Sequence, residues 1–262
     1  MLALASRPDP EISPNGAIVL VYYDENLLYF VGNFVCHARR IVDPDGRPFR
    51  HFALVARSES AAEALVRLDP SVRPHIFVAE EILRTPTSVW GPWVKRLPRL
   101  EASRGWGSMP FRAMSCVRDM LTPPIVELGI SVLFLDADQL VVRDPFTHPT
   151  FRRVARAVDI AYACDRPLGY PGCSADTSPD ECLNVQSWWC PVLNSGTYFA
   201  AARRPRVIAR VMTAITVTCL GLGRDVLFQV LGVNESVGPL ANASPPRTLR
   251  EGRDALWGQH MG

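Results

Sequence analysis

Short runs of apolar residues alternate with amphipathic stretches along this chain, and the alternation limits the fold more than any other feature. Residues 17–23, 52–56 and 75–79 form three such runs, which are rich in β-branched and aromatic side chains and have the length of buried strands. Between them, apolar residues recur at helical spacing in residues 27–35 and again in residues 62–66. A strand–helix alternation is typical of a parallel sheet covered by helices on both faces. The sequence therefore predicts an α/β fold.

Polar residues mark where the first two helices begin. Asp24 follows the first apolar run and Ser58 follows the second, and both residue types cap helix N-termini. Further strands are predicted over residues 131–135, 159–164 and 197–201, and further helices over residues 111–121 and 205–219. On the last helix the spacing places five residues on the buried face: Ile208, Val211, Met212, Ile215 and Cys219.

The length and the distribution of prolines indicate one domain. Residues 1–16 contain three prolines and are predicted to form a disordered or loosely draped lead, while residues 17–262 form a single domain. Residues 84–110, rich in Pro, Gly and Trp, are predicted to be a long surface connection, and residues 165–193 the largest insertion. No internal repeat interrupts this organisation.

Charge and hydropathy exclude several classes of protein. The formal net charge is +2, so the chain lacks the basic excess of a nucleic-acid-binding protein. No stretch reaches the roughly 18 to 20 consecutive apolar residues that a membrane span requires. At the N-terminus, charged residues and prolines at positions 7–11 precede any long apolar run, so neither a signal peptide nor a membrane anchor is visible in this sequence.

Four of the seven cysteines lie close together in the sequence, at Cys164, Cys173, Cys182 and Cys190. They contain no C-x-x-C pair, so their spacing fits no zinc site. Two interpretations stay open. The thiols are buried or free, or they form one or two disulfides, which would indicate an oxidising compartment.

The segment SVLFLDADQLVVRDPF, residues 131–146, carries the chemistry. Its apolar strand ends at Asp136, and Asp138 follows one residue later. Ligands of open α/β sheets bind beyond the carboxyl ends of the strands, and two carboxylates this close repel each other unless a cation lies between them. Oxygen ligands suit Mn²⁺ or Mg²⁺, which leave coordination positions for phosphate oxygens. We therefore predict that Asp136 and Asp138 hold a metal that clamps a diphosphate; the simpler interpretation is a strand end with two solvated acids.

Metal-dependent phosphotransferases of the haloacid dehalogenase type also place a D-x-D motif after an apolar strand, with the first Asp as nucleophile. In those enzymes the motif lies near the start of the domain and a lysine follows downstream. Here at least three predicted strands precede Asp136, and the only lysine, Lys95, lies upstream. The phosphotransferase interpretation is therefore a remote alternative.

Two blocks of the sequence resemble one family. The first, within residues 105–146, comprises a Gly-rich lead, a helix, Leu128-Gly129, the D-x-D motif and Arg143-Asp144-Pro145; the second is LNSGTYF, residues 193–199, followed by Arg204-Pro205. In this order they resemble the nucleotide-diphospho-sugar transferase family, which includes plant cell-wall arabinosyl- and xylosyltransferases. The resemblance extends over most of residues 17–232, with a weaker match at Asn33-Phe34. It implies a GT-A, Rossmann-like fold, in which this chain would be shortened at its carboxyl end.

The resemblance and the residue chemistry suggest further site residues. Asn194, Ser195 and Gly196 are expected to bind sugar hydroxyls, because the amide offers donors and an acceptor and glycine permits close approach; a simple tight turn is the alternative. Asp24 is expected, by analogy with the fold, to meet the uracil or ribose, although helix capping is the simpler account. Arg112 is expected to reach the diphosphate, with an ordinary surface arginine as the alternative.

The resemblance also suggests a catalytic role for Asp225 and Asn194 near the anomeric carbon. Relatives carry an Asp-Gln pair on a following helix; Asp225 matches the acid, but Val226 stands where the family has Gln. A negative charge at a helix start is the alternative account of Asp225.

The implied activity is a metal-dependent transfer, with retention of configuration, of a hexosyl or pentosyl group from a nucleoside-diphosphate sugar, most naturally a UDP-sugar. The implied acceptor is a glycan or glycoprotein, and the implied location is the Golgi lumen. The rival interpretation is a degenerate family member that binds a nucleotide-sugar without turnover, which Val226 favours.

Overall fold

The computed structural model describes residues 1–9, 11–42, 46–84, 116, 118–164 and 193–219. Within these residues a six-stranded sheet has the order β3-β2-β1-β4-β6-β5. Its strands are β1 (Ala17–Tyr23), β2 (Phe52–Ala56), β3 (Ile76–Val78), β4 (Ser131–Leu135), β5 (Ile160–Cys164) and β6 (Leu193–Ala200). All pairs among β1 to β4 are parallel, whereas β6 runs antiparallel to both β4 and β5. The prediction of a mostly parallel sheet is confirmed.

The first strand lies at the centre of the sheet and is buried along its whole length. Its register pairs Val21 with Leu54 of β2 on one side and with Leu135 of β4 on the other. A strand with two parallel neighbours and two covered faces must be apolar at every position, because water reaches neither face. This explains why the sequence here is a continuous apolar run rather than an alternating one.

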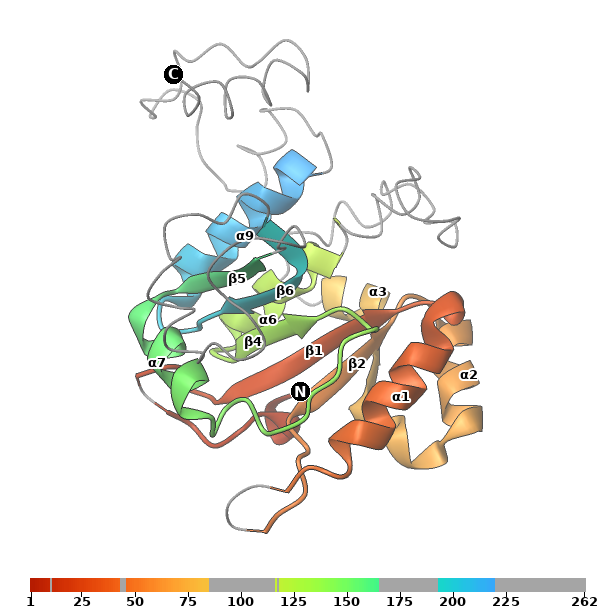
Figure 1. Cartoon of the computed structure of the whole chain (residues 1–262). Helices are drawn as coiled ribbons and strands as arrows, with labels where there is room; N and C mark the ends of the chain where they lie inside the picture. Colours follow the sequence, from red (N-terminus) through yellow and green to blue (C-terminus); the bar gives the residue numbers. More distant parts are fainter. Residues whose placement is uncertain (10, 43–45, 85–115, 117, 165–192, 220–262) are drawn as a thin grey trace, which may run out of the picture.

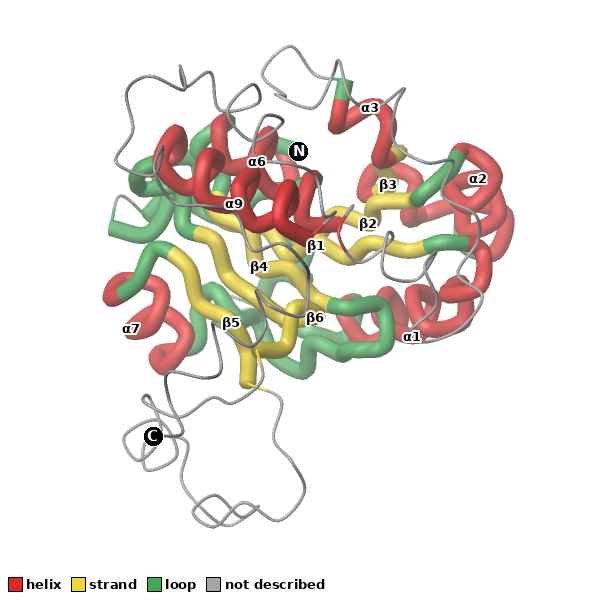
Figure 2. The backbone as a smooth tube through the Cα atoms, turned by 90° about the horizontal axis from the view of Figure 1, so that it is seen from above, coloured by secondary structure: helices red, strands yellow, loops and turns green. Residues whose placement is uncertain are grey.

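Helices cover both faces of the sheet (Figures 1 and 2). On one face, α1 (Leu28–Ala38), α2 (Glu59–Leu68) and α7 (Pro149–Ala157) pack on the odd-numbered residues of β1. On the other face, α3 (Ala79–Leu83), α6 (Thr122–Glu127) and α9 (Pro205–Cys219) pack on the even-numbered residues. Successive side chains of a strand point to opposite faces, so one apolar strand contributes to both cores.

The predicted helix starts at Asp24 and Ser58 are confirmed. Asp24 accepts a hydrogen bond from Asn26 N at 3.0 Å and begins the 3-10 turn η2 (Glu25–Leu27), which leads into α1. Ser58 accepts from Ala61 N at 3.2 Å at the start of α2. Asp69 then ends α2 and begins the 3-10 helix η3 (Pro70–His75).

Two of the predicted helices differ from the structure in detail. The helix expected to end at Leu121 is followed by α6, which contains Pro123 and Pro124; prolines are tolerated there because the first turn of a helix has no internal N–H bonds to lose. In α9, Val211 is 42% exposed, whereas the polar Thr213 and Thr216 are buried. The Thr216 hydroxyl donates to Met212 O at 2.9 Å, so its burial leaves no unsatisfied group.

The lead that we predicted to be disordered or loosely draped is bonded to the sheet in this structure. It begins with the 3-10 turn η1 (Leu2–Leu4), and Ser6 N donates to Ala17 O at 2.8 Å. Ser13 is buried, donates to Gly129 O at 3.0 Å and accepts from Ser131 N at 3.0 Å. In the part of the chain that the structure describes, no helix has the length and apolar character needed to cross a membrane.

Candidate functional site

The D-x-D segment forms a tight turn directly after β4. Asp136 N donates to Gly196 O at 2.7 Å, and Gln139 N donates back to Asp136 O at 3.0 Å. Ala137 is buried inside the turn, whereas Asp138 is exposed. The turn therefore directs two acidic residues to the carboxyl edge of the parallel strands, the edge at which open α/β sheets bind their ligands.

The second predicted block lies beside this turn as part of β6, so the alternative interpretation of this block as a simple tight turn is wrong. Asn194, Ser195 and Gly196 belong to the strand, because its antiparallel pairing with β4 extends to Thr197 and the Asp136–Gly196 bond continues the pairing. A register shift in the β5–β6 pairing skips residues 195–197 of β6, which identifies a bulge. Bulges are common beside active sites because they redirect the chain.

Side chains join the two blocks as well as the backbone. The Thr197 hydroxyl donates to Gln139 Oε1 at 2.5 Å, which connects β6 to the end of the D-x-D turn. On the other side of β4, Phe134 stacks on Tyr198 with ring centroids 5.1 Å apart, and the Tyr198 and Thr122 hydroxyls lie 2.6 Å apart. These contacts fix the position of β4, and so of Asp136, relative to β6.

Arg118 contacts Asp136 from the protein interior, and Asp119 lies beside Arg118. The sequence analysis predicted a role for neither Arg118 nor Asp119. Arg118 Nη1 lies 2.6 Å from Asp136 Oδ1, and Arg118 Nε lies 4.0 Å from Asp119 Oδ1. Arg118 and Asp119 are buried. A charged Arg-Asp pair directly before the apolar stretch 120–126 was the available signal, since neighbouring charges can be buried only when they are paired.

Burial dominates the electrostatics of this cluster. It raises the pKa of Asp119 to about 7, although Arg118 acts in the opposite direction, and the charge of Asp136 adds to the rise. Burial likewise raises the pKa of Tyr162 to about 12 and places that of Tyr198 well above its ordinary value, and the negative charge of Asp119 contributes to both. The two tyrosines are therefore neutral at physiological pH.

At the neighbouring end of β1, Asp24 is fully buried and its carboxylate caps η2. The adjacent Glu25 accepts hydrogen bonds from the Ser58 hydroxyl at 2.7 Å and the Ser60 hydroxyl at 2.6 Å, and Arg57 lies 3.3 Å away. The capping interpretation of Asp24 is thus confirmed. Contact of Asp24 with a nucleotide stays a prediction.

Of the other predicted site residues, Arg112 and Asp225 lie outside the described residues, as does Val226. The structure joins Asp136 to β6 through the backbone hydrogen bond to Gly196, and Asn194 and Ser195 precede Gly196 in the same strand. The roles of all these residues in binding or catalysis stay predictions.

The donor set at the D-x-D turn suits a cation that also takes ligands from a substrate. Among the described residues, no group of three or more His, Cys, Asp or Glu side chains could hold a metal ion. The side chain of Asp136 is 41% exposed and Asp138 is exposed, so among the described residues these two carboxylates are the ones available at the turn. Mg²⁺ is commonly held by one or two carboxylates together with phosphates and water, and Mn²⁺ has similar ligand preferences. The residues present therefore fit such an ion.

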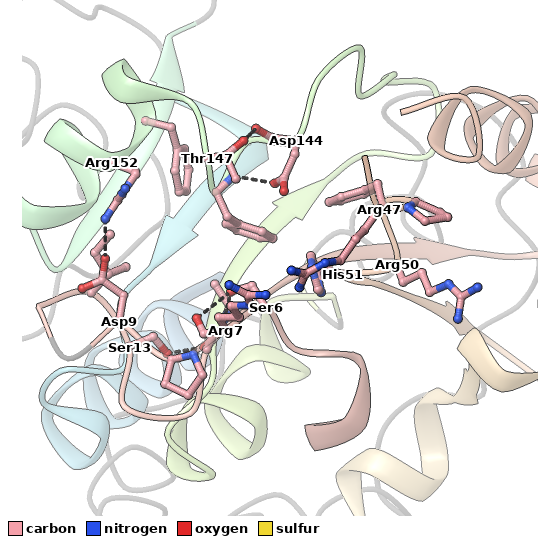
Figure 3. Close-up of a pocket in the computed structure, with 18 residues that line it drawn as sticks. Ser6, Arg7, Asp9, Ser13, Arg47, Arg50, His51, Asp144, Thr147 and Arg152 are labelled. Carbon is pink, nitrogen blue, oxygen red and sulfur yellow. Dashed lines mark hydrogen bonds and ion pairs between the residues drawn. The ribbon is translucent and has the colours of Figure 1, made fainter. Parts of the chain in front are cut away.

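A cavity of about 590 Å³ lies away from this turn, near the amino ends of the strands (Figure 3). The lead, residues 47–51 and the start of α7 line it, with Phe49, Phe146 and Phe151 as its apolar part. Asp9 and Arg152 form an ion pair of 3.0 Å in its wall. Because it contains neither Asp136 nor Asp138, we do not assign the chemistry to this cavity.

Two solved structures are similar to this chain at low sequence identity. The apo structure of the WbbM bifunctional glycosyltransferase is 16% identical with a TM-score of 0.41, and the match covers 87% of this chain and 39% of that one. The apo structure of mouse xyloside xylosyltransferase 1 is 13% identical with a TM-score of 0.40, with 82% of this chain and 81% of that one covered. A comparison with curated proteins gives no match.

A family model supplies the assignment that these structures leave open. The model of the nucleotide-diphospho-sugar transferases matches residues 79–208. This range contains β4, the D-x-D turn, the Arg118–Asp119 pair and β6, which are the elements that build the site. Residues 79–208 therefore match the nucleotide-diphospho-sugar transferase family.

Proposed function

We propose that this protein is a metal-dependent glycosyltransferase that moves a hexosyl or pentosyl group from a UDP-sugar to a glycan or glycoprotein acceptor. The observation that carries the proposal is the turn at the end of β4. It places Asp136 and Asp138 at the carboxyl edge of the sheet, bonded to the Gly196 backbone and backed by Arg118. The match of residues 79–208 to the nucleotide-diphospho-sugar transferases supports the substrate class.

In this proposal Asp136 and Asp138 hold Mn²⁺ or Mg²⁺ and orient the donor diphosphate. The bound cation supplies Lewis-acid stabilisation of the negative charge that develops on the diphosphate. Arg118 contributes a fixed positive charge beneath Asp136, and preorganised charges of this kind stabilise a transition state without reorganising. The backbone of Asn194 to Gly196 follows the bulge of β6 at the same edge, which supports the proposal that this segment binds the donor sugar.

Transfer breaks the bond between the anomeric carbon and the diphosphate oxygen, and the diphosphate leaves with the electron pair. The acceptor hydroxyl oxygen forms the new bond to that carbon and releases its proton. We propose that the reaction retains configuration, with the diphosphate receiving the proton on the face that it has left. Asn194 and Asp225 are the residues that we propose to stabilise the positive charge on the anomeric carbon.

The test is nucleotide binding with and without Mn²⁺, measured by calorimetry on the full chain. Asp136→Asn and Asp138→Asn should each weaken Mn²⁺-supported UDP binding by at least about tenfold, or roughly 1.4 kcal/mol. Glu25→Gln is a matched control, because it neutralises an acid at the same sheet edge outside the D-x-D turn. If both aspartate variants bind UDP as tightly as the parent does in Mn²⁺, the metal role is wrong.

A binding protein without turnover is the second candidate function. Val226 favours it, because relatives carry Gln at this position beside the acid that Asp225 matches. Hydrolysis of a panel of nucleotide-sugars separates the two candidates. A transferase slowly releases the sugar from its own donor in Mn²⁺, whereas a binding protein leaves every donor intact.

The proposed acceptor class agrees with a location in the Golgi lumen, which is also a proposal. Cys116 is disulfide-bonded in this structure, and disulfides persist in oxidising compartments. Of the four cysteines predicted to contain a disulfide, Cys164 is the last residue of β5, and Cys173, Cys182 and Cys190 lie outside the described residues. Thiol counting under denaturing, non-reducing conditions on protein from its native compartment tests the location; seven free thiols would contradict it.

A further inference from the structure

Arg118 is a buried cation held between two carboxylates of different exposure. It lies 2.6 Å from Asp136 Oδ1 and 4.0 Å from Asp119 Oδ1. The side chains of Arg118 and Asp119 are 10% and 8% exposed, whereas that of Asp136 is 41% exposed. One positive charge is therefore shared between an inner acid and an outer acid.

The surroundings hold the guanidinium in this position. Its central carbon lies 5.6 Å from the centre of the Phe134 ring, and that ring stacks on Tyr198. A planar guanidinium packed on an aromatic ring and bonded to a carboxylate has few other positions available. The Asp136 carboxylate is therefore fixed from beneath, and the fixing group is itself positively charged.

This arrangement opposes a second cation at the same carboxylate. A divalent ion that binds Asp136 approaches a group whose negative charge Arg118 already compensates in part, and like charges in a poorly hydrated site repel strongly. A diphosphate changes the balance, because its negative charges attract both the metal and the arginine. Asp119 has an effect similar to that of the diphosphate, because its negative charge compensates part of the positive charge of Arg118 and so reduces the repulsion of a cation at Asp136.

We propose that Arg118, held by Asp119, is a positioning residue that makes divalent-cation binding at Asp136 depend on the nucleotide diphosphate. This inference rests on the proposed function and deepens it. Without nucleotide, the ion pair with Arg118 compensates the charge of Asp136, and the divalent cation binds weakly. With nucleotide, the diphosphate compensates both positive charges, so metal and nucleotide each strengthen the binding of the other, as thermodynamic linkage requires.

The test measures Mn²⁺ binding to the full chain without nucleotide, from the loss of the free-ion electron paramagnetic resonance signal. Arg118→Met should bind Mn²⁺ at least about fivefold more tightly than the parent, or roughly 1 kcal/mol. Its buried Asp119 then lacks a cation, and the variant can fail to fold for this reason. The double variant Arg118→Met/Asp119→Asn removes both charges and should show the same gain. Asp119→Asn alone should weaken Mn²⁺ binding, because the inner carboxylate then no longer compensates part of the Arg118 charge next to Asp136.

Arg203→Met is the control for loss of a partly buried arginine. Arg203 lies beside Asp159 at the opposite edge of the sheet, 3.2 Å from its carboxylate, and its side chain is 25% exposed. This variant should leave Mn²⁺ binding unchanged. UDP added with saturating Mn²⁺ should bind less tightly to the Arg118 variants than to the parent, a loss that a purely structural role would not combine with a gain in metal affinity.

An unchanged or weaker Mn²⁺ affinity in the folded double variant would overturn the inference. Asp136→Asn separates this failure from failure of the proposed function. If Asp136→Asn weakens Mn²⁺-supported UDP binding while the Arg118 variants leave metal binding unchanged, only the inference on Arg118 is wrong. If Asp136→Asn changes nothing either, the metal role itself is wrong.

Discussion

Two acidic clusters lie at the carboxyl edge of the same sheet. In one cluster the pKa of a carboxyl group lies below its ordinary value, and in the other it lies above. At the ends of β1 and β2, Glu25 accepts hydrogen bonds from Ser58 and Ser60 and faces Arg57. Burial alone would raise its pKa, but these partners outweigh it and lower the pKa of Glu25 to about 2. At the end of β4, burial raises the pKa of Asp119 to about 7 although Arg118 lies beside it.

The two clusters differ in the hydrogen-bond donors and cations that surround the carboxylate. Glu25 is ringed by donors on its own and neighbouring elements, so its negative charge strengthens the connection between η2 and α2. Asp119 lies in an apolar environment, and its neighbouring cation is shared with Asp136. The first cluster therefore stabilises the fold, whereas the second holds charge at a cost in stability, as functional sites commonly do.

The largest effect in this comparison should be the pH dependence that Asp119 causes. Its folded-state pKa, about 7, lies above its ordinary value of 3.8, so the folded state binds more protons between these values. Stability should therefore fall as the pH rises from 5 to 7, by about 2 kcal/mol through this group. Urea unfolding of the parent and of Asp119→Asn measures the contribution, because the variant cannot titrate at this position.

Glu25→Gln serves as the control for that measurement. Glu25 is ionised in both states across this pH range, so its replacement should leave the slope between pH 5 and 7 unchanged. If the parent and Asp119→Asn show the same slope, Asp119 ionises at its ordinary pH and the contrast between the two clusters disappears.

Much of the fold was predictable because its strongest signals are local. The strands β1, β2 and β4 match the predicted ranges to the residue, since a centrally buried strand must be a continuous apolar run. The two D-x-D carboxylates follow β4 directly, so topology alone assigns them to the ligand-binding edge. These inferences need only one segment of sequence at a time.

The missed features depend on contacts between segments. Gly196 indicated a turn, but pairing with β4 keeps it in a strand, where tertiary structure overrides local preference. Helix α7 was not predicted, because its buried surface includes only Ala155 fully and its arginines give no apolar stripe. The pairing of Arg118 with Asp136 joins residues from a helical segment and a strand end, and no spacing rule connects them.

The second effect, smaller than the first, concerns Glu25. Glu25→Gln should lose about 1 kcal/mol of stability at pH 7, because an amide cannot accept from every donor that surrounds the carboxylate. Water screens part of the loss, since the side chain is 35% exposed. A carboxyl with a lowered pKa stabilises the fold above its ordinary value and loses this effect as the pH falls toward 2. The difference between parent and variant in urea unfolding should therefore shrink from pH 5 downward; a difference that is constant with pH would contradict the charge-based account.

The smallest effect on stability should be that of Asp138, and it gives the sharpest form of the comparison. Asp138 is exposed, and within the described residues it makes no hydrogen bond or ion pair. Asp138→Asn should therefore unfold within about 0.5 kcal/mol of the parent at every pH from 5 to 8. An acid that contributes nothing to the fold but is required for Mn²⁺-supported UDP binding must act on the ligand, whereas Glu25→Gln should show the reverse, with stability lost and UDP binding kept. Unfolding and calorimetry on the same two preparations decide the question. If Asp138→Asn loses stability, or if Glu25→Gln loses UDP binding, the division into one cluster that stabilises the fold and one that binds the ligand is wrong.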